Sequence, residues 1–210
     1  MKMRWYTLLK SWAVKDREIT KTYQEIVNAY SESHRHYHTL PHIAHVLDTL
    51  ETLRPKAQDW LALQCAAWFH DIVYDPTQRT NEAESAAVAQ GYLEAWSIDR
   101  DRIHTIKRLI LATQDHRIPD DLPDAALLLD ADLAILGSAP QDYDRYAAAI
   151  RREYDWVSLA EYQQGRIAVL QNFLQRDRIY HTNRLFADLE QAARHNLQTE
   201  IHCHQRSLNS

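Results

Sequence analysis

The spacing of apolar residues is the feature that most restricts how this chain can fold. Apolar side chains recur at intervals of three and four residues, as at Tyr23, Ile26 and Tyr30, which is the period of a helix that buries one face. The chain has only three glycines in 210 residues, whereas sheet-rich folds need more glycine in their tight turns. We therefore expect an all-α fold, a bundle of about eight to ten helices.

Signals for helix ends support this interpretation. Pro41, which follows Thr39, is suited to the first turn of a helix. Gly137 follows an apolar run and is expected to cap the preceding helix. Three residue pairs have the spacing of a capping box: Asn81 with Glu84, Ser138 with Gln141, and Ser158 with Glu161. The helices are expected at about 4–14, 18–31, 41–53, 58–72, 81–96, 99–115, 124–136, 140–155, 158–175 and 183–199.

Length and charge limit the domain organisation and the partners. A chain of 210 residues can form one sizeable core, so we expect a single domain over residues 1–210, with its core at about 20–195 and a polar, frayed tail at 200–210. The net charge of −5 argues against a nucleic-acid partner, which requires a basic face. A local basic pocket for a phosphorylated small molecule remains compatible with this charge.

Cysteine content and hydropathy indicate the compartment. Cys65 lies in an apolar run and is expected to be a buried thiol, and with Cys203 as the second cysteine no disulfide framework is indicated. The N-terminal residues 1–5 lack the apolar core of a signal peptide, and no stretch approaches about 18 uninterrupted apolar residues. We expect a cytoplasmic protein with no membrane partner.

Three groups of polar residues interrupt these apolar segments. His70 and Asp71 directly follow the run 66–69, and Asp130 and Asp132 lie within another apolar run. Burying a carboxylate without a partner costs several kcal/mol, so such a group should be paired or hold a metal ion. The third group is a cluster of histidines: His34, His36, His38, His42 and His45.

The residue types in these groups favour a divalent metal ion. His70 and Asp71 are about 100° apart around a helix, so both can contact one ion beyond the helix end. Imidazole and carboxylate ligands suit zinc, manganese, iron, cobalt or nickel. Each group alone also has a simpler explanation, because such residues can satisfy helix ends or lie in solvated loops. A tail site from His202, Cys203 and His204 is a weaker alternative.

Taken together, the groups resemble the HD-domain superfamily of metal-dependent phosphohydrolases. The longer stretches 68–75 and 128–137, with Asn81 and Glu82, resemble a bacterial branch of predicted HD phosphohydrolases. The resemblance covers about residues 20–195 and implies hydrolysis of a phosphoester of a nucleotide or similar small molecule. It also implies one divalent ion, which would be Mn, Fe, Zn, Co, Ni or Mg. The three motifs are Tyr37-His38-Thr39-Leu40-Pro41-His42-Ile43, Phe69-His70-Asp71 and Leu129-Asp130-Ala131-Asp132-Leu133.

The resemblance implies four metal ligands. His42 is preferred to His38 because the superfamily's first histidine opens a helix with an apolar stripe. Asp132 is preferred to Asp130 because the superfamily's last aspartate directly precedes a large apolar residue. The implied ligands are His42, His70, Asp71 and Asp132.

Asp71 and Asp75 are the catalytic candidates. Asp71 would bind the ion and also accept a hydrogen bond from the attacking water. In the stringent-response nucleotide hydrolases of this superfamily, acidic residues just after the doublet assist the water. Tyr74 replaces one of those acids here, which argues against that particular activity. The further candidates, for contacting substrate or supporting the ligands, are His38, Arg35, Glu82, His116 and Asp130.

Phosphate requires a cationic partner, and Arg35 is the best placed because it lies within the histidine cluster. Arg151, Arg152 and Arg166 are more simply explained as parts of solvated helix faces. Tyr37 or Tyr74, beside the expected ligands, could stack on a nucleotide base. Two alternatives to an enzyme stay open: a non-catalytic metal- or nucleotide-binding regulatory module, and a purely structural helical protein.

Overall fold

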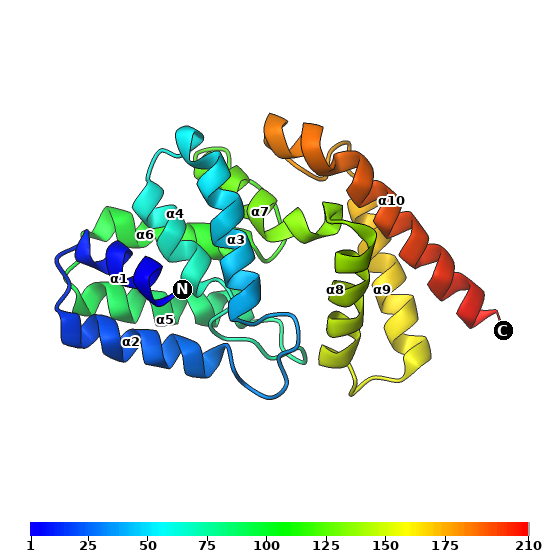
Figure 1. Ribbon diagram of the computed structural model, residues 1–210, viewed down its shortest axis with the longest axis horizontal. Coiled ribbons are helices and arrows are strands. Elements are labelled where there is room, and N and C mark those ends of the chain that lie inside the picture. The colour runs from blue at the N-terminus through cyan, green and yellow to red at the C-terminus, as the bar shows by residue number, and fades with distance from the viewer. Residues whose placement is uncertain (210) are drawn as a thin grey trace. The chain divides into compact units, whose positions relative to one another are not determined.

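The computed structural model describes residues 1–209, which form an all-α structure (Figure 1). Over this range it has ten α-helices, two short 3₁₀-helices and no strand, as predicted. The α-helices are α1 (Lys2–Lys10), α2 (Asp16–Ala29), α3 (Leu40–Leu53), α4 (Trp60–Phe69), α5 (Asn81–Ala95), α6 (Arg100–Ala112), α7 (Asp124–Leu133), α8 (Pro140–Glu153), α9 (Leu159–Leu174) and α10 (Asn183–Leu208), and the 3₁₀-helices are η1 (Arg54–Lys56) and η2 (Ala134–Gly137).

The chain divides into two compact units, residues 1–131 and residues from 132 onward. The division falls inside α7, so that one continuous helix contributes eight residues to the first unit and its last two, Asp132 and Leu133, to the second. The expectation of a single domain stays a prediction.

Helix α4 is the centre of the first unit. It packs against α1, α3, α5 and α6, and its residues Leu63, Cys65 and Trp68 are fully buried. Cys65 is thus the buried thiol that the sequence predicted, and burial raises its pKa. Because residues 65–69 at the end of α4 are fully buried, His70 directly after them is buried as well, with 1% of its surface exposed.

Helix α3 begins as predicted. Thr39 precedes the helix and Pro41 lies in its first turn, where the missing proline N–H leaves no helical hydrogen bond unmade. Ile43, Val46 and Leu50 form its buried face. This apolar face fixes the rotation of the helix, and with it the direction of His42 one residue earlier.

The polar segment that its composition predicted to fray is helical over residues 200–208, since α10 continues to Leu208. Ser210 lies outside the described residues. Glu200 on α10 is buried and accepts hydrogen bonds from Arg166 Nε at 2.8 Å and Nη2 at 3.2 Å. Tyr143 on α8 donates to the same carboxylate. The buried ion pair of Arg166 and Glu200 joins α9 to α10, and the hydrogen bond from Tyr143 adds α8. These contacts hold α10 beyond the residue where its apolar pattern ends.

Two of the three predicted capping boxes are absent, and Gly137 does not act as a left-handed cap. Ser158 and Glu161 form the predicted box, but Thr80 and Ala139 precede α5 and α8 without a side-chain cap. The described glycines have no positive φ. A Cβ on Gly137 would instead lie 2.6 Å from the Cβ of Leu189, so this glycine permits close packing against α10.

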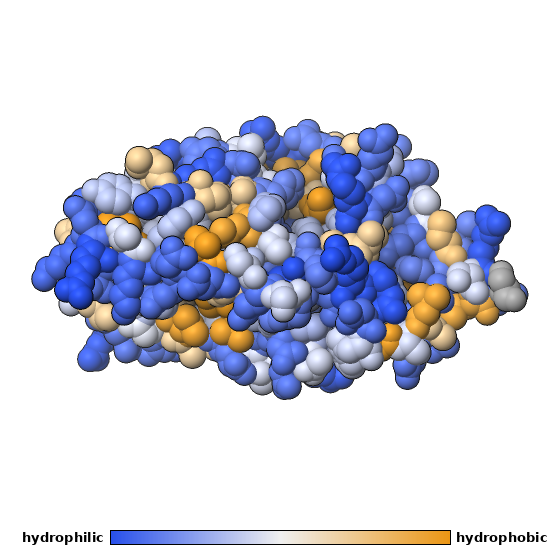
Figure 2. Space-filling view, turned by 60° about the horizontal axis from the view of Figure 1, so that its bottom comes forward, coloured by the Kyte–Doolittle hydropathy of each residue, from blue (hydrophilic) through white to orange (hydrophobic). Residues whose placement is uncertain are grey.

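Figure 2 shows one face of the molecule, where hydrophilic residues predominate and hydrophobic residues occur in several separate groups. Among the described residues, no helix has both the length and the apolar character needed to cross a membrane.

Candidate metal centre

Three helices carry the residues that the sequence singled out as metal ligands. His42 is the third residue of α3, His70 and Asp71 directly follow α4, and Asp132 is the second-to-last residue of α7. The two histidines are buried, with 3% and 1% of their surface exposed. The side chain of Asp71 is 17% exposed, and Asp132 is half-buried. The carboxylates therefore lie between the buried rings and solvent.

The ligand atoms of these residues converge. His42 Nε2 lies 3.1 Å from His70 Nε2. Asp71 Oδ2 lies 3.1 Å from His70 Nε2 and 3.4 Å from His42 Nε2. In addition, His42, His70 and Asp132 each offer a ligand atom within 4.8 Å of the other two. His42 and His70 thus lie close to each other, to Asp71 and to Asp132, although these residues lie up to 90 positions apart in the sequence.

These separations fit a coordinated ion. A metal about 2.0–2.1 Å from nitrogen and oxygen ligands holds neighbouring ligands about 3.0 Å apart in octahedral geometry and about 3.4 Å apart in tetrahedral geometry. The three separations among His42, His70 and Asp71 span the same range. Independently of these three distances, the group of His42, His70 and Asp132 could hold a metal ion, and its mixed nitrogen and oxygen donors do not select one metal.

A hydrogen bond sets the orientation of the His70 ring. Its Nδ1 lies 3.0 Å from the carbonyl oxygen of Ala67 and donates its proton to it. A neutral histidine that donates through Nδ1 has its lone pair on Nε2. That nitrogen is the one that faces His42 and Asp71, so in the neutral ring Nε2 is the atom that can bind a cation.

The Asp71 carboxyl is ionised at neutral pH. Burial raises its pKa, but the adjacent His70 ring and hydrogen bonds with His42 and His70 lower it by more, and the pKa lies well below its usual value of 3.8. At neutral pH Asp71 thus presents a negatively charged oxygen beside the two histidine nitrogens.

Arg35 contacts the main chain at the doublet, since it donates hydrogen bonds to the carbonyl oxygens of Asp71 at 2.7 Å and of Ile72 at 3.0 Å. The arginine side chain has no exposed surface and donates to main-chain carbonyls on either side of the site. Its guanidinium is therefore directed at the protein backbone rather than at an open face where a phosphate would bind.

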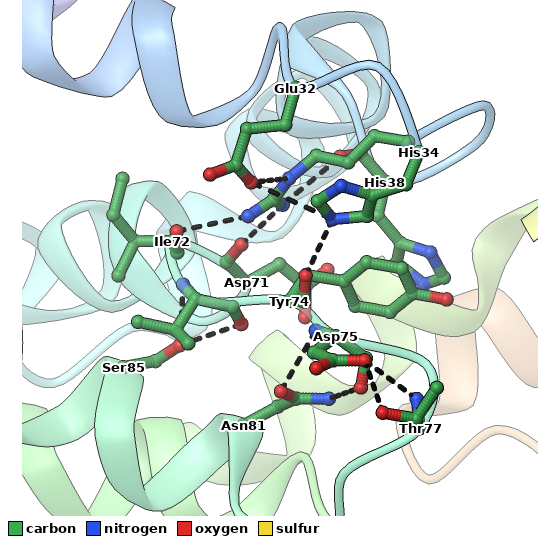
Figure 3. Close-up of polar contacts among 12 residues, drawn as sticks. Glu32, His34, His38, Asp71, Ile72, Tyr74, Asp75, Thr77, Asn81 and Ser85 are labelled. Carbon is green, nitrogen blue, oxygen red and sulfur yellow. Dashed lines mark hydrogen bonds and ion pairs between the residues drawn. The ribbon is translucent and has the colours of Figure 1, made fainter.

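His38 and Tyr74 pack against each other beside the ligands (Figure 3). Their ring centroids are 4.2 Å apart, and the His38 ring lies 5.8 Å from that of His42. Tyr74 also contacts His34 at 6.3 Å and the guanidinium of Arg35 at 5.5 Å. Tyr37 also packs on histidine rings, with centroids 5.0 Å from His38 and 4.8 Å from His42, and both tyrosines are half-buried.

Asp75 shapes the loop after the doublet. Its Oδ1 accepts hydrogen bonds from the Thr77 main-chain N–H at 2.8 Å and from the Thr77 hydroxyl at 2.7 Å. The main-chain groups of Asp75 bond to the side chain of Asn81 (Figure 3). The residue is exposed, and these contacts give no support to the catalytic role expected for it.

The remaining candidates are placed as follows. Glu82 is half-buried in the first turn of α5. His116 follows α6 in a left-handed conformation, with φ of 49°, and Asp130 is fully buried on α7. None of the three belongs to the group formed by His42, His70 and Asp132.

The three arginines that the sequence placed on solvated helix faces lie in the second unit. Arg166 is buried and forms an ion pair with Glu200. Arg151 donates to the carbonyls of Tyr154 and Val157, and Arg152 is half-buried on α8.

Three supporting residues were missed by the sequence analysis. Tyr30 donates its hydroxyl to the carbonyl of Trp68 at 3.0 Å, Glu32 accepts from Arg35 at 2.9 Å, and Ser85 bonds to both main-chain groups of Val73. Tyr30 and Ser85 thus bind the main chain on either side of the doublet in the sequence, and Glu32 binds Arg35, which itself binds that main chain. Only Glu32, three residues before Arg35, had a spacing that could have revealed its pairing.

Comparison with protein-family models, with curated proteins and with solved structures gives no match to this chain.

Proposed function

We propose that this protein is a metal-dependent phosphohydrolase that cleaves a phosphoester of a nucleotide or similar small molecule. The observation that carries the proposal is the convergence of His42 Nε2, His70 Nε2 and Asp71 Oδ2 within 3.4 Å of one another. Asp132 completes the four-ligand set that the sequence resemblance implied. These four residues would hold one divalent ion.

The residues of the proposed site would have different roles. The neutral His42 and His70 rings would bind the ion without cancelling its charge. Asp71, ionised at neutral pH, would also accept a hydrogen bond from the attacking water and so orient it. A divalent ion bound there supplies positive charge that stabilises negative charge developing on the phosphoryl group. The partial exposure of Asp71 leaves a route for water and substrate.

The test combines metal content with a substrate panel. The full chain is freed of metal and reloaded with Mn²⁺, and phosphate release is measured over nucleoside mono-, di- and triphosphates and sugar phosphates. We expect release from at least one compound, and a loss of about 100-fold or more in Asp71→Asn, because this change removes the negative charge of the ligand and replaces one of its two acceptor oxygens with an NH₂ donor.

Asp48→Asn is the matched control. Asp48 is a carboxylate on α3 whose side chain is 62% exposed and paired with Arg4, so its substitution should leave phosphate release within about twofold of the parent. Equal rates in the parent and Asp71→Asn would refute the proposed site.

The same experiment separates the alternatives. A regulatory module would bind Mn²⁺ but release no phosphate from any compound. A purely structural protein would bind no metal, and its unfolding temperature would not change with a chelator, since a ligand that binds only the folded state must stabilise it.

A further inference from the structure

We infer that Arg35 is a positioning residue for the metal centre, which holds the main chain of the histidine loop and of the doublet in one arrangement. The inference rests on the proposed metal site. In this role Arg35 contacts neither metal nor substrate. The role also accounts for a fully buried cationic side chain beside a site proposed to bind a metal cation.

The guanidinium of Arg35 joins two segments of the chain. Its Nη1 donates to the carbonyl of His38 at 3.2 Å and to that of Asp71 at 2.7 Å. Its Nη2 donates to the carbonyl of Ile72 at 3.0 Å, and its Nε donates to Glu32 Oε2 at 2.9 Å. Figure 3 shows these partners gathered around one point. The loop before α3 and the loop after α4 are thus tied to each other by a single side chain.

Two aromatic rings fix the plane of the guanidinium. Its central carbon lies 5.1 Å from the centroid of Tyr30 and 5.5 Å from that of Tyr74, within the range in which a cation is attracted to a ring. Tyr30 in turn donates to the carbonyl of Trp68 on α4. The arginine therefore cannot turn away from the two loops without losing these contacts.

The carbonyls that Arg35 binds belong to the two residues that follow the C-cap of α4. The helix ends at Phe69 with His70 as its C-cap, so the carbonyls of Asp71 and Ile72 lie outside its hydrogen-bond pattern. A cation there is favoured by the helix dipole. By binding both carbonyls, Arg35 fixes the direction in which the chain leaves α4, and this direction sets where the Asp71 carboxylate points.

Lysine should not replace Arg35. The ammonium group is a single point of charge, whereas the planar guanidinium presents separate donors to carbonyls on different segments. We expect Arg35→Lys to keep the charge, lose the link between the loops, and let Asp71 move away from His42 and His70. Loss of residues that orient ligands commonly weakens metal binding 10- to 100-fold.

The test measures metal binding and coordination, not only turnover. The metal-free full chain is titrated with Mn²⁺ by calorimetry, and its Co²⁺ form is examined by visible absorption, which reports the ligand arrangement. Arg35→Lys is expected to raise the Mn²⁺ Kd at least about tenfold and to shift the Co²⁺ spectrum. Both measurements are made below the unfolding temperature of the variant.

Arg194→Lys is the matched control. Arg194 on α10 makes the same kind of clamp in the second unit, since it donates to Glu190 and to the carbonyls of Leu174, Arg176 and Asp177 at the end of α9. Its substitution should lower the unfolding temperature, as Arg35→Lys does, but leave the Mn²⁺ Kd within about twofold and the Co²⁺ spectrum unchanged.

If Arg35→Lys lowers only the unfolding temperature, with an unchanged Kd and spectrum, Arg35 is merely structural and the inference is wrong. If the parent protein binds no Mn²⁺, the proposed function fails together with the inference.

Should Arg35→Lys not fold, Glu32→Ala is measured in its place, because the exposed Glu32 accepts the hydrogen bond from the Nε of Arg35. A Kd raised about threefold or more would support the inference, and an unchanged Kd would overturn it.

Discussion

Replacing Glu200 with glutamine should strongly destabilise the second unit. The carboxylate of Glu200 accepts two hydrogen bonds from Arg166 and one from Tyr143, and both side chains of the ion pair are 8% exposed. The substitution keeps the shape of the side chain but leaves the Arg166 charge buried, where it also donates a hydrogen bond to the Tyr146 hydroxyl at 3.3 Å.

Breaking one side of a buried ion pair costs about 3–5 kcal/mol. Because glutamine retains one acceptor for Arg166, we expect the lower end, about 3 kcal/mol. In a chain of this size, 1 kcal/mol corresponds to about 2–4 °C, so the unfolding temperature should fall by about 6–12 °C.

The assay is urea unfolding at pH 7, followed by circular dichroism. Thr199→Ala is the control, because Thr199 is exposed one residue earlier on the same helix and should change the stability by no more than about 0.5 kcal/mol. A loss below about 1 kcal/mol in Glu200→Gln would refute the reasoning, since the ion pair would then not hold the end of α10.

Two further predictions concern the same unit. Burial raises the pKa of Glu200, but hydrogen bonds from Arg166 and the Arg166 charge lower it by more, so the folded pKa lies below its ordinary value of 4.5. The stabilisation by Glu200 is therefore fully present above pH 4.5 and is lost as the pH falls through the folded pKa. When unfolding is measured at several pH values, the stability difference between the parent and Glu200→Gln should shrink between pH 5 and pH 3. A difference that stays constant over this range would contradict the prediction. Gly137→Ala should cost about 1–3 kcal/mol by overpacking, because the new Cβ would lie 2.6 Å from Leu189 Cβ and 2.9 Å from Leu189 O. Gly165→Ala, where a Cβ meets nothing within 4 Å, should instead stabilise α9 by about 0.5–1 kcal/mol. The unfolding temperatures of the two variants test these predictions. Equal changes in unfolding temperature would show that the structure relaxes around a Cβ at residue 137 without cost.

The helices were predictable because their signals are local. The interval of three and four between apolar residues predicted α3 and α9 to within two residues of their observed ends, and Ser158 with Glu161 formed the capping box that their spacing indicated. Such features depend on neighbours within one or two turns, so the sequence contains all the information that they need.

The end of α10 and the role of Gly137 were not predictable, because both depend on partners far away in the sequence. Glu200 belongs to a polar stretch, and only the position of Arg166 on α9 makes it a buried residue. Gly137 needs to be glycine because Leu189 packs against it, and no local pattern signals a contact 52 positions away.

The candidate site shows the same division. The sequence by itself determined the ligand types, since histidines and aspartates at the ends of buried helices require a partner for their polar groups. Only the tertiary structure decided that His42, His70 and Asp71 meet within 3.4 Å, that Arg35 faces carbonyls instead of solvent, and that Asp75 turns toward Thr77. Side-chain chemistry is fixed residue by residue, whereas direction and distance follow from how buried faces pack, and that packing involves the whole unit at once.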